Sequence, residues 1–296
     1  LTYTDAELEA AYQADSKAYD KAAWEYVVVS GAADSTTDAD GNTVQATDEE
    51  QAAAKETAKA TAEEILAAYN SGKSLESIAG NYEKATYYNT TDATYYDGVV
   101  GNWLFDDARK DGDTEILEVG TNYYVGLFHS RGREEYKTVD IRHILITPET
   151  GTKAQGDEGY EDEQTQLKAA ARTKAEEILA QWKSGEATED SFAQLALENS
   201  ADGSKYDGGL YTRVTKGWAV EEFNDWCFDA SRKDGDTGIV DTTYGSHVMY
   251  FVGYDLPAWA ASVTSDLQEK ASSEWSTALS ENADVQQSDF GMKFVG

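Results

Sequence analysis

Trp103-Leu-Phe-Asp-Asp-Ala-Arg-Lys-Asp-Gly-Asp-Thr114 recurs later in the chain as Trp226-Cys-Phe-Asp-Ala-Ser-Arg-Lys-Asp-Gly-Asp-Thr237, with nine of the twelve positions identical. A second match, Ala-Glu-Glu-Ile-Leu-Ala, occupies 62–67 and 175–180, in the same order along the chain. Two ordered matches of this quality are typical of an internal repeat, which decides the architecture before any other feature does. The chain is therefore predicted to be a tandem duplication.

Each copy contains the same succession of elements. A short run rich in β-branched residues comes first, at 25–30 and at 141–147. A helix with Ile, Leu and Ala at helical spacing follows, then a short helix, the Trp-x-Phe-Asp segment and a closing strand pair. The last strands are expected at 123–128 and 247–252. Strands at both ends with helices between them predict the α+β class, in which each copy forms a small antiparallel sheet covered by helices.

The two copies are flanked by predicted terminal helices. Thr4-Asp-Ala-Glu7 is a capping box that starts a helix running to about Ala23, and Pro257 opens another helix. The apolar stripe of that last helix is expected to pack against the body of the protein, the alternative being a groove for partner peptides. The acidic stretches 32–47 and 151–163 are expected to be surface loops. The predicted domains are 1–23, an N-terminal helix; 24–136, the first copy; 137–255, the second copy; and 256–296, a C-terminal helix and tail.

The charge excludes several classes of partner. Acidic residues number 56 and basic residues 24, which gives 24 − 56 = −32. A surface this negative repels nucleic acid and anionic lipid, so neither is expected to bind. No run of 18 apolar residues occurs, so membrane contact is expected only through an anchor missing from a chain that starts at Leu1, a trimmed or mature fragment. The single Cys227 and three histidines without metal-ligand spacing predict no disulfide, no metal site and no cofactor.

The second copy contains six short motifs in an order and spacing that resemble those of a known family. They are His143-Ile-Leu-Ile, Phe192-Ala-Gln-Leu-Ala196, Ser200-Ala-Asp202, Gly208-Gly-Leu210, Glu222-Phe223 and Thr242-Thr-Tyr-Gly-Ser-His247. Across residues 138–255 the sequence resembles the parvulin-type peptidyl-prolyl cis-trans isomerases. With its terminal helices the whole chain is similar to exported foldases of the PrsA/SurA type. That resemblance implies an extracytoplasmic protein, at the cell surface or tethered to the membrane of a Gram-positive-type bacterium.

The resemblance also implies an active site in the second copy. The family's paired histidines match His143 and His247, its Cys or Asp position matches Asp202, and the hydroxyl beside the second histidine matches Thr242. The alternatives are core histidines and a turn-forming aspartate. The residues expected to bind the proline ring are Leu210, Phe223, Trp218 and Ala219, the last standing where the family usually has methionine.

These residue types suit the isomerisation of a peptide bond. Rotation about the C–N bond faces a barrier of about 18–20 kcal/mol, because resonance makes that bond partly double. An enzyme accelerates the rotation by binding the twisted form better than the planar forms. A dry apolar pocket beside a hydrogen-bonded polar cluster can do this without a nucleophile or a metal ion.

The first copy lacks these residues. Tyr26 stands where the second copy has His143, and Tyr124 stands where it has His247. The stretch that would carry the aspartate and the Gly-Gly-Leu motif is about ten residues shorter, since the repeat offset grows from 113 to 123. The first copy is therefore interpreted as a degenerate, non-catalytic domain. Its many tyrosines either bind unfolded segments or fill loops.

The leading hypothesis is a foldase whose second copy isomerises X-Pro bonds in unfolded or nascent exported polypeptides. The main alternative is a non-catalytic holdase chaperone or binding module, in which both copies are scaffolds, and a weaker one is an adhesive surface protein. The residue that separates the first two is Trp218. If its ring fills the proline pocket, the non-catalytic alternative is favoured.

Overall fold

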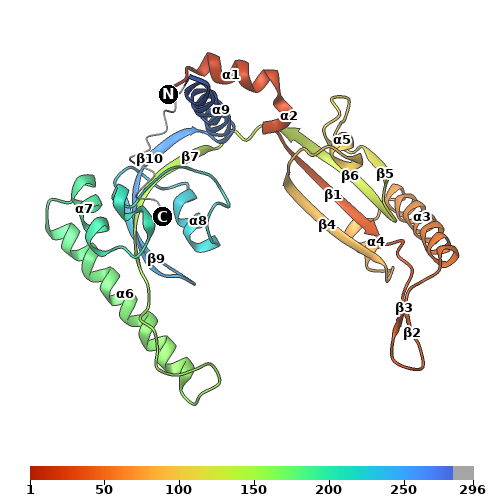
Figure 1. The fold of residues 1–296 in the computed structure, drawn as a ribbon, viewed down its shortest axis with the longest axis horizontal. Helices are drawn as coiled ribbons and strands as arrows, with labels where there is room; N and C mark the ends of the chain where they lie inside the picture. Colours follow the sequence, from red (N-terminus) through yellow and green to blue (C-terminus); the bar gives the residue numbers. More distant parts are fainter. Residues whose placement is uncertain (283–296) are drawn as a thin grey trace, which may run out of the picture. The chain divides into compact units, whose positions relative to one another are not determined.

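The chain folds into two compact units. The computed structural model describes residues 1–282, so the expected tail at 283–296 lies outside the described residues. The first unit spans Thr2–Glu134, and the second begins at Glu135. Each unit has an antiparallel four-stranded sheet with helices packed on it (Figure 1). This confirms the α+β class expected from the sequence.

The first unit is built around the sheet β4-β1-β6-β5. Helices α3 and α4 pack on one face of this sheet and α5 on the other. The elements are α1 (Asp5–Ala14), α2 (Ser16–Tyr19), β1 (Lys21–Val29), β2 (Thr36–Thr37), β3 (Thr43–Val44), α3 (Asp48–Asn70), α4 (Leu75–Ala79), β4 (Ala85–Ala93), α5 (Val99–Leu104), β5 (Thr114–Val119) and β6 (Asn122–Gly132).

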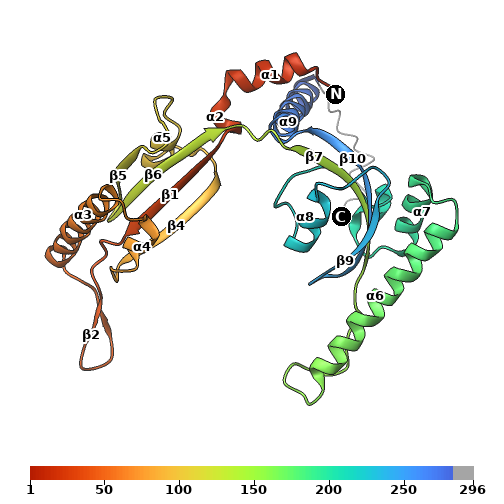
Figure 2. The same ribbon diagram turned by 180° about the vertical axis from the view of Figure 1, so that it is seen from behind.

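The second unit has the same arrangement, with the strand order β8-β7-β10-β9 (Figure 2). Helices α6 and α7 cover one face of the sheet, and α8 covers the other. The elements are β7 (Lys137–Ile146), α6 (Tyr160–Ser184), α7 (Glu189–Asn199), the 3-10 helix η1 (Gly203–Asp207), β8 (Leu210–Val214), α8 (Glu221–Phe228), β9 (Thr237–Thr242), β10 (Gly245–Pro257) and α9 (Ala258–Asn282).

The two sheets agree in register as well as in strand order. Tyr26 on β1 and His143 on β7 occupy corresponding positions of the second strand in each sheet. Tyr124 on β6 and His247 on β10 are their counterparts on the neighbouring strands. Each lies two residues before the residue that pairs directly with Tyr26 or His143. Side chains two residues apart on a strand point to the same face of the sheet. The tyrosine pair and the histidine pair therefore occupy equivalent sites.

The expectation of one N-terminal helix to Ala23 is wrong. Helix α1 ends at Ala14, α2 is a single turn, and β1 begins at Lys21. The cause is the burial of Asp20, whose carboxylate accepts a hydrogen bond from Tyr12 (2.7 Å) and lies 3.3 Å from Arg131 Nε. Immediately after it, Ala22 is fully buried in the core. These tertiary contacts override the helix propensity of the alanine-rich sequence.

The two expected loops are partly ordered into regular structure. The 32–47 stretch contains the hairpin β2–β3, and the 151–163 stretch ends early because α6 starts at Tyr160. In the first turn of α6, the Glu163 carboxylate accepts hydrogen bonds from the backbone N–H groups of Thr152 and Lys153. The helix thereby orders the loop in front of it.

The C-terminal helix packs along its first turns only. Trp259 and Val263 are buried, whereas Trp275 and Leu279 further along α9 are exposed. The expected packing of the whole apolar stripe is therefore correct for its first part and wrong for its last.

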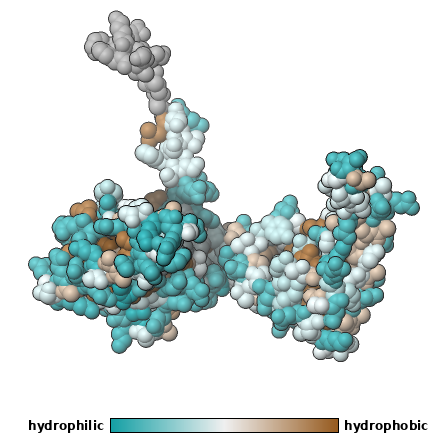
Figure 3. Space-filling model, turned by 90° about the horizontal axis from the view of Figure 1, so that it is seen from below, coloured by the Kyte–Doolittle hydropathy of each residue, from teal (hydrophilic) through white to brown (hydrophobic). Residues whose placement is uncertain are grey.

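The surface is strongly polar. Figure 3 shows hydrophilic and intermediate residues over most of the displayed face, with hydrophobic residues only in small areas, which agrees with the net charge of −32. Within residues 1–282, no helix is both long enough and apolar enough to cross a bilayer.

Candidate active site

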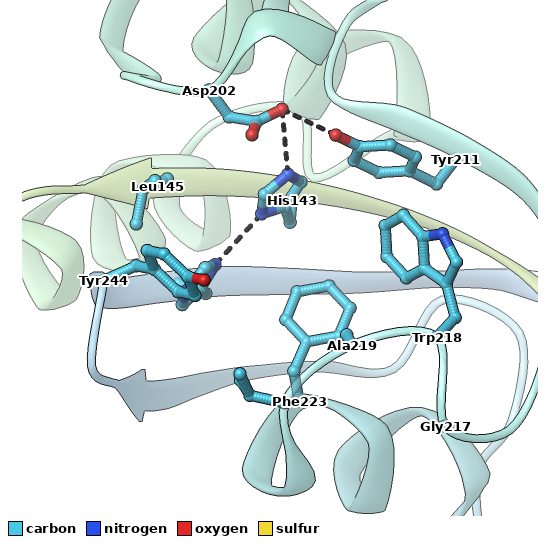
Figure 4. Close-up of a pocket in the computed structure, with 11 residues that line it drawn as sticks. His143, Leu145, Asp202, Tyr211, Gly217, Trp218, Ala219, Phe223 and Tyr244 are labelled. Carbon is cyan, nitrogen blue, oxygen red and sulfur yellow. Dashed lines mark hydrogen bonds and ion pairs between the residues drawn. The ribbon is translucent and has the colours of Figure 1, made fainter. Parts of the chain in front are cut away.

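A cavity of 540 Å³ opens on the face of the second sheet that α8 covers (Figure 4). The histidines and Leu145 come from the two central strands. The remaining wall comes from the segment before η1, strand β8, the loop into α8, α8 itself and the turn between β9 and β10. The lining residues are His143, Leu145, Asp202, Tyr211, Gly217, Trp218, Ala219, Val220, Phe223, Tyr244 and His247.

Two glycines hold the acidic wall of this cavity against the sheet. Gly208 and Gly209 have φ angles of +66° and +75°, a region that side-chain-bearing residues rarely adopt. Gly209 O accepts a hydrogen bond from the backbone N–H of His143 at 2.9 Å. A Cβ atom on Gly209 would lie 2.3 Å from His143 O. The Gly-Gly pair thus serves a backbone requirement, bringing the segment that carries Asp202 close to β7.

Asp202 is held as a carboxylate by a dense set of donors. Its Oδ1 accepts hydrogen bonds from Ser204 N (2.8 Å), Ser204 Oγ (2.5 Å) and Tyr211 Oη (3.0 Å), and lies 3.3 Å from His143 Nε2. Burial raises the pKa of Asp202, but the hydrogen bonds from Ser204, the positive charge that His143 carries when protonated at acidic pH, and the Tyr211 hydroxyl outweigh it and hold the pKa at about 2. The group is ionised at neutral pH.

The two histidines face each other through their Nδ1 atoms. These atoms are 3.1 Å apart, and the rings are stacked with centroids 5.3 Å apart and an interplanar angle of 17°. The Nε2 atom of His247 lies 2.9 Å from Thr242 Oγ1. Burial lowers the pKa of both imidazoles, to about 4 for His247, and Asp202 only partly opposes this for His143. Both rings are therefore neutral at pH 7.

The donor and acceptor roles follow from these contacts. His143 Nε2–H donates to the Asp202 carboxylate, which leaves the Nδ1 atom of this neutral ring as an acceptor. His247 Nδ1–H donates to the Nδ1 atom of His143. Because the His247 ring is neutral, its Nε2 atom then accepts a hydrogen bond from the hydroxyl group of Thr242. The four residues form one directed chain of hydrogen bonds that ends on a negative charge. This chain of hydrogen bonds brings together the four residues that the sequence analysis predicted as catalytic.

The apolar wall is arranged around Phe223. Its ring meets both imidazoles edge to face, at centroid distances of 5.5 Å from His143 and 5.3 Å from His247. Trp218 contacts the Tyr211 ring at 4.7 Å and is 50% exposed. It forms part of the wall and leaves the cavity open, so the condition that favours the non-catalytic alternative is not met. Ala219 also lines the cavity.

Leu210 is the exception among the expected pocket residues. It does not line the cavity, whereas its neighbour Tyr211 does. Adjacent residues of a strand point to opposite faces, so on β8 only one of the two can face the histidines. The motif Gly-Gly-Leu drew attention to the wrong member of the pair. Leu145 was also missed, although its position two residues after His143 on the same strand places it on the same face.

The equivalent site of the first unit is filled by aromatic rings. Tyr26 and Tyr124 are stacked with centroids 5.8 Å apart at 18°, close to the geometry of the histidine pair. Tyr26 also stacks on Trp24 (4.0 Å) and Tyr88 (5.0 Å). Phenol rings preserve the stack but supply no imidazole nitrogens. This unit therefore cannot form the chain of hydrogen bonds found in the second.

Comparison with known proteins agrees with this geometry. Residues 125–252 match the family model described as the PPIC-type PPIase domain. This segment, which is less than half of the chain, is similar to the parvulin-type isomerase domains. The family resemblance drawn from the motifs is thereby confirmed. No cluster of three or more metal-ligating side chains capable of holding an ion occurs in the described part of this chain.

The parvulin domain has curated relatives among bacterial foldases. The chain is 29% identical over 142 residues to foldase protein PrsA 1 of Listeria innocua and 28% identical to that of Listeria monocytogenes, covering 46% of this chain and 39% of each relative. Among solved structures, PrsA from Bacillus subtilis is 23% identical with a TM-score of 0.34, covering 51% of this chain and 52% of that one. The chain matches less than half the length of the Listeria proteins. The activity of those whole proteins can therefore only be proposed for this chain.

Proposed function

We propose that the second unit catalyses cis-trans isomerisation of X-Pro bonds in unfolded polypeptides. The observation that carries the proposal is the directed hydrogen-bond chain from Thr242 through His247 and His143 to Asp202, beside an open apolar cavity in a parvulin domain. Uncatalysed isomerisation takes about 10–100 s at 25 °C, which is slow enough to limit folding. A foldase of this kind removes that delay.

The apolar wall and the carboxylate of the cavity favour the transition state over the planar forms of the peptide bond. A planar peptide group carries a dipole of about 3.5 D, which depends on resonance between nitrogen and carbonyl. Twisting the bond removes this resonance, so the carbonyl oxygen loses partial negative charge. A wall of apolar side chains and a nearby carboxylate both disfavour that negative charge, and they therefore destabilise the planar forms more than the twisted form.

Each proposed residue has a distinct task. Asp202 supplies the negative field, and His143 and His247 connect it to Thr242 while their neutral rings form part of the cavity wall. The prolyl ring is held by the apolar wall that includes Phe223. No step transfers a proton to or from the substrate. The remaining substrate-binding residues are Trp218 and Ala219.

The first unit and the terminal helices are proposed to hold unfolded chain while the second unit acts. Tyr88 and Tyr96 expose 46% and 53% of their surface, and phenol rings provide amphipathic contacts for extended segments. We also propose an extracytoplasmic location in a Gram-positive-type bacterium, at the cell surface or tethered to the membrane, by analogy with the foldases that the domain resembles. The partners are then nascent exported polypeptides.

The direct test is an isomerase assay on unphosphorylated X-Pro peptides. Wild type should accelerate exchange, and Asp202→Asn and His247→Ala should each lower kcat/KM at least tenfold. The duplication offers a matched control, because Tyr124→Ala removes the corresponding residue of the first unit and should leave kcat/KM unchanged. Absence of acceleration for every peptide would refute catalysis. In that case, suppression of client aggregation by the same protein would identify the non-catalytic holdase.

A further inference from the structure

The two four-stranded sheets have four edge strands, β4 and β5 in the first unit and β8 and β9 in the second. An edge strand carries a row of unpaired backbone N–H and C=O groups, which can pair with a further strand. Proteins commonly block such edges with charged side chains, irregular pairing or short strands. Three of these four edges are blocked in this way, whereas β4 is not.

The edge strands β5 and β9 each form an ion pair with a helix of their own unit. On β5, Glu118 lies 2.6 Å from Lys55 of α3. On β9, Asp241 lies 2.7 Å from Arg172 of α6. A strand added at either edge would cover these charged groups, which costs free energy. The two units thus block the equivalent edge by the same means.

The edge strand β8 is blocked by its irregularity. It has only five residues, and Arg213 interrupts it with a φ angle of +53°. The pairing of β8 with β7 shifts register here, and the backbone N–H of Arg213 donates to the Asp140 carboxylate at 2.7 Å. A short, charged and irregular strand offers no regular ladder of hydrogen bonds to a further strand.

Strand β4 has none of these features over most of its length. Its residues 85–90 pair with residues 24–29 of β1 in unbroken register, and the irregularity of this strand pair lies beyond Thr90. None of these six residues is charged, although 27% of the chain is. None is buried, and both ribbon views draw β4 as the outermost strand of its sheet (Figures 1 and 2). We call residues 85–90 the open edge.

The backbone of the open edge has no partner on its outer side. Apart from the pairing with β1, β4 makes backbone hydrogen bonds within residues 1–282 only at its ends. Ala85 N donates to Tyr82 O at one end, and Asp92 N donates to Thr90 Oγ1 at the other. Between these ends, every second residue directs its N–H and C=O groups away from β1. An extended polypeptide can pair with them without displacing any existing contact.

A row of stacked tyrosine rings ends at the open edge. Tyr124 on β6 stacks on Tyr26 on β1 at 5.8 Å, and Tyr26 stacks on Tyr88 on β4 at 5.0 Å. Tyr88 pairs directly with Tyr26 and is 46% exposed, with no strand beyond it. An aromatic or aliphatic side chain on an added strand would cover the exposed part of this ring, a cross-strand contact that stabilises sheets.

We propose that the open edge binds an extended, uncharged segment of an unfolded polypeptide by β-strand addition, with an aromatic or aliphatic side chain of the segment on Tyr88. In this mode main-chain hydrogen bonds supply the affinity and alternate side chains supply the selectivity. The proposal rests on the function proposed for the first unit, the holding of unfolded chain, and gives that function a site. A second copy of this chain is a less suitable occupant, because two molecules that each carry a charge of −32 repel each other.

The test uses the proline-free peptide acetyl-Ser-Thr-Val-Thr-Tyr-Thr-Val-Ser-amide, in which apolar side chains alternate with threonine. Because it contains no X-Pro bond, it is not a substrate for the second unit. Amide hydrogen exchange is followed by NMR while the peptide is titrated into the full chain. Saturation should slow exchange about tenfold or more at the amides of residues 85–90 that do not bond to β1, and leave the amides of β5 unchanged. Absence of binding, or binding without protection of β4, would refute the proposal.

Variants test the contact with the tyrosine ring. Tyr88→Thr keeps a residue suited to a strand and removes the ring, so it should weaken the Kd of the peptide by up to about fivefold. Tyr254→Thr is the matched control, because Tyr254 is also 46% exposed but lies on β10 of the second unit, and it should leave the Kd unchanged. Exchanging the tyrosine of the peptide for threonine should weaken binding to wild type and have little further effect on Tyr88→Thr. Equal Kd values for Tyr88→Thr and Tyr254→Thr would contradict the placement of the segment on Tyr88.

Suppression of client aggregation separates this proposal from the function on which it rests. If the peptide protects β4 but the protein does not suppress aggregation, the open edge binds a strand and only the holding function fails. If aggregation is suppressed equally with and without saturating peptide, and β4 is not protected, unfolded chain is held elsewhere and the open edge is overturned. Sedimentation of the peptide-free protein tests the second copy as occupant. A dimer whose formation protects the amides of residues 85–90 would overturn the proposed occupant.

Discussion

Gly209→Ala should damage both the stability and the activity of the second unit. Two effects add at this position. A left-handed φ costs a non-glycine residue about 1–2 kcal/mol, and the new Cβ atom would stand 2.3 Å from His143 O. The obstacle is backbone of a central strand, so the strand and the η1 segment must separate. This weakens the hydrogen bond from His143 N to Gly209 O, which adds about 1 kcal/mol.

The total predicted loss is about 2–3 kcal/mol, which lowers the Tm of a domain of this size by roughly 4–12 °C. The same separation moves Asp202 away from His143. A misplacement of about 1 Å can reduce activity about 100-fold, so kcat/KM should fall more than tenfold at temperatures where the variant is folded. Calorimetry and the isomerase assay measure the two effects on one preparation.

Gly156→Ala is the matched control. Gly156 belongs to the same unit and has a φ of +101°, but a Cβ atom there would meet nothing within 4 Å. It should lose only the conformational part, about 1–2 kcal/mol, and keep full activity. The reasoning is refuted if Gly209→Ala loses no more stability than Gly156→Ala, because the close approach of the two backbones would then have no energetic consequence.

Other perturbations test the remaining contacts. Burial lowers the pKa of His247 from its ordinary 6.5 to about 4, so between these pH values the unfolded chain binds more protons than the folded chain. The free energy of unfolding of the second unit should therefore fall by up to about 3 kcal/mol as the pH decreases from 6.5 to 4. His247→Gln should flatten this dependence of stability on pH. The pKa of Asp202 is lowered from 3.8 to about 2, so its contribution is present above pH 3.8 and lost as the pH falls toward 2, and Asp202→Asn should remove about 1–2 kcal/mol of acid-dependent stability in urea titrations at each pH. Burial raises the pKa of the Cys227 thiol to about 12, so it should react with Ellman's reagent only when the second unit unfolds, and rapid labelling of the native protein would contradict its burial. Phe223→Ala should reduce stability by about 3–5 kcal/mol and raise KM, whereas a variant with normal KM would remove Phe223 from the proline pocket.

Local sequence signals were sufficient where the determining contacts are close in the chain or repeated within it. The duplication and the α+β class rest on identities and spacings that need no tertiary information, whereas the polar site residues of the second unit were implied by the resemblance to the parvulin family. His143 and His247, for example, are 104 residues apart, and the sequence predicts them on the first and last strands of the second copy. It does not specify that their Nδ1 atoms face each other, since that depends on the register between β7 and β10.

The errors have a common physical origin in tertiary packing. The alanine-rich start of the chain favours a helix locally, but the buried contacts of Asp20 with Tyr12 and Arg131 turn it into a strand at Lys21. The prediction that Leu210 lines the pocket failed because the phase of β8 relative to the cavity is set by pairing with β7. Neither contact leaves a periodic trace in the sequence.

The repeated segment explains why the two units share a fold without sharing a site. In both copies its arginine donates through Nε to the tryptophan carbonyl, Arg109 to Trp103 at 3.2 Å and Arg232 to Trp226 at 3.1 Å. In both, the guanidinium lies over the indole ring, at 4.6 Å and 4.1 Å. These identical contacts fix the turn that leads into the closing strands, so they constrain the sheet equally in each unit.

The positions that differ lie on the sheet face that carries His143 and His247 in one unit and Tyr26 and Tyr124 in the other. A scaffold kept rigid by the repeated segment tolerates such exchange, because the stacked geometry of the central pair survives with either ring type. Catalysis then needs only one copy to retain its nitrogens and its carboxylate. It follows that introducing histidine in the first unit, as Tyr26→His with Tyr124→His, should preserve the stack and add no isomerase activity to that of the second unit, because the shorter loop of the first unit supplies no counterpart of Asp202.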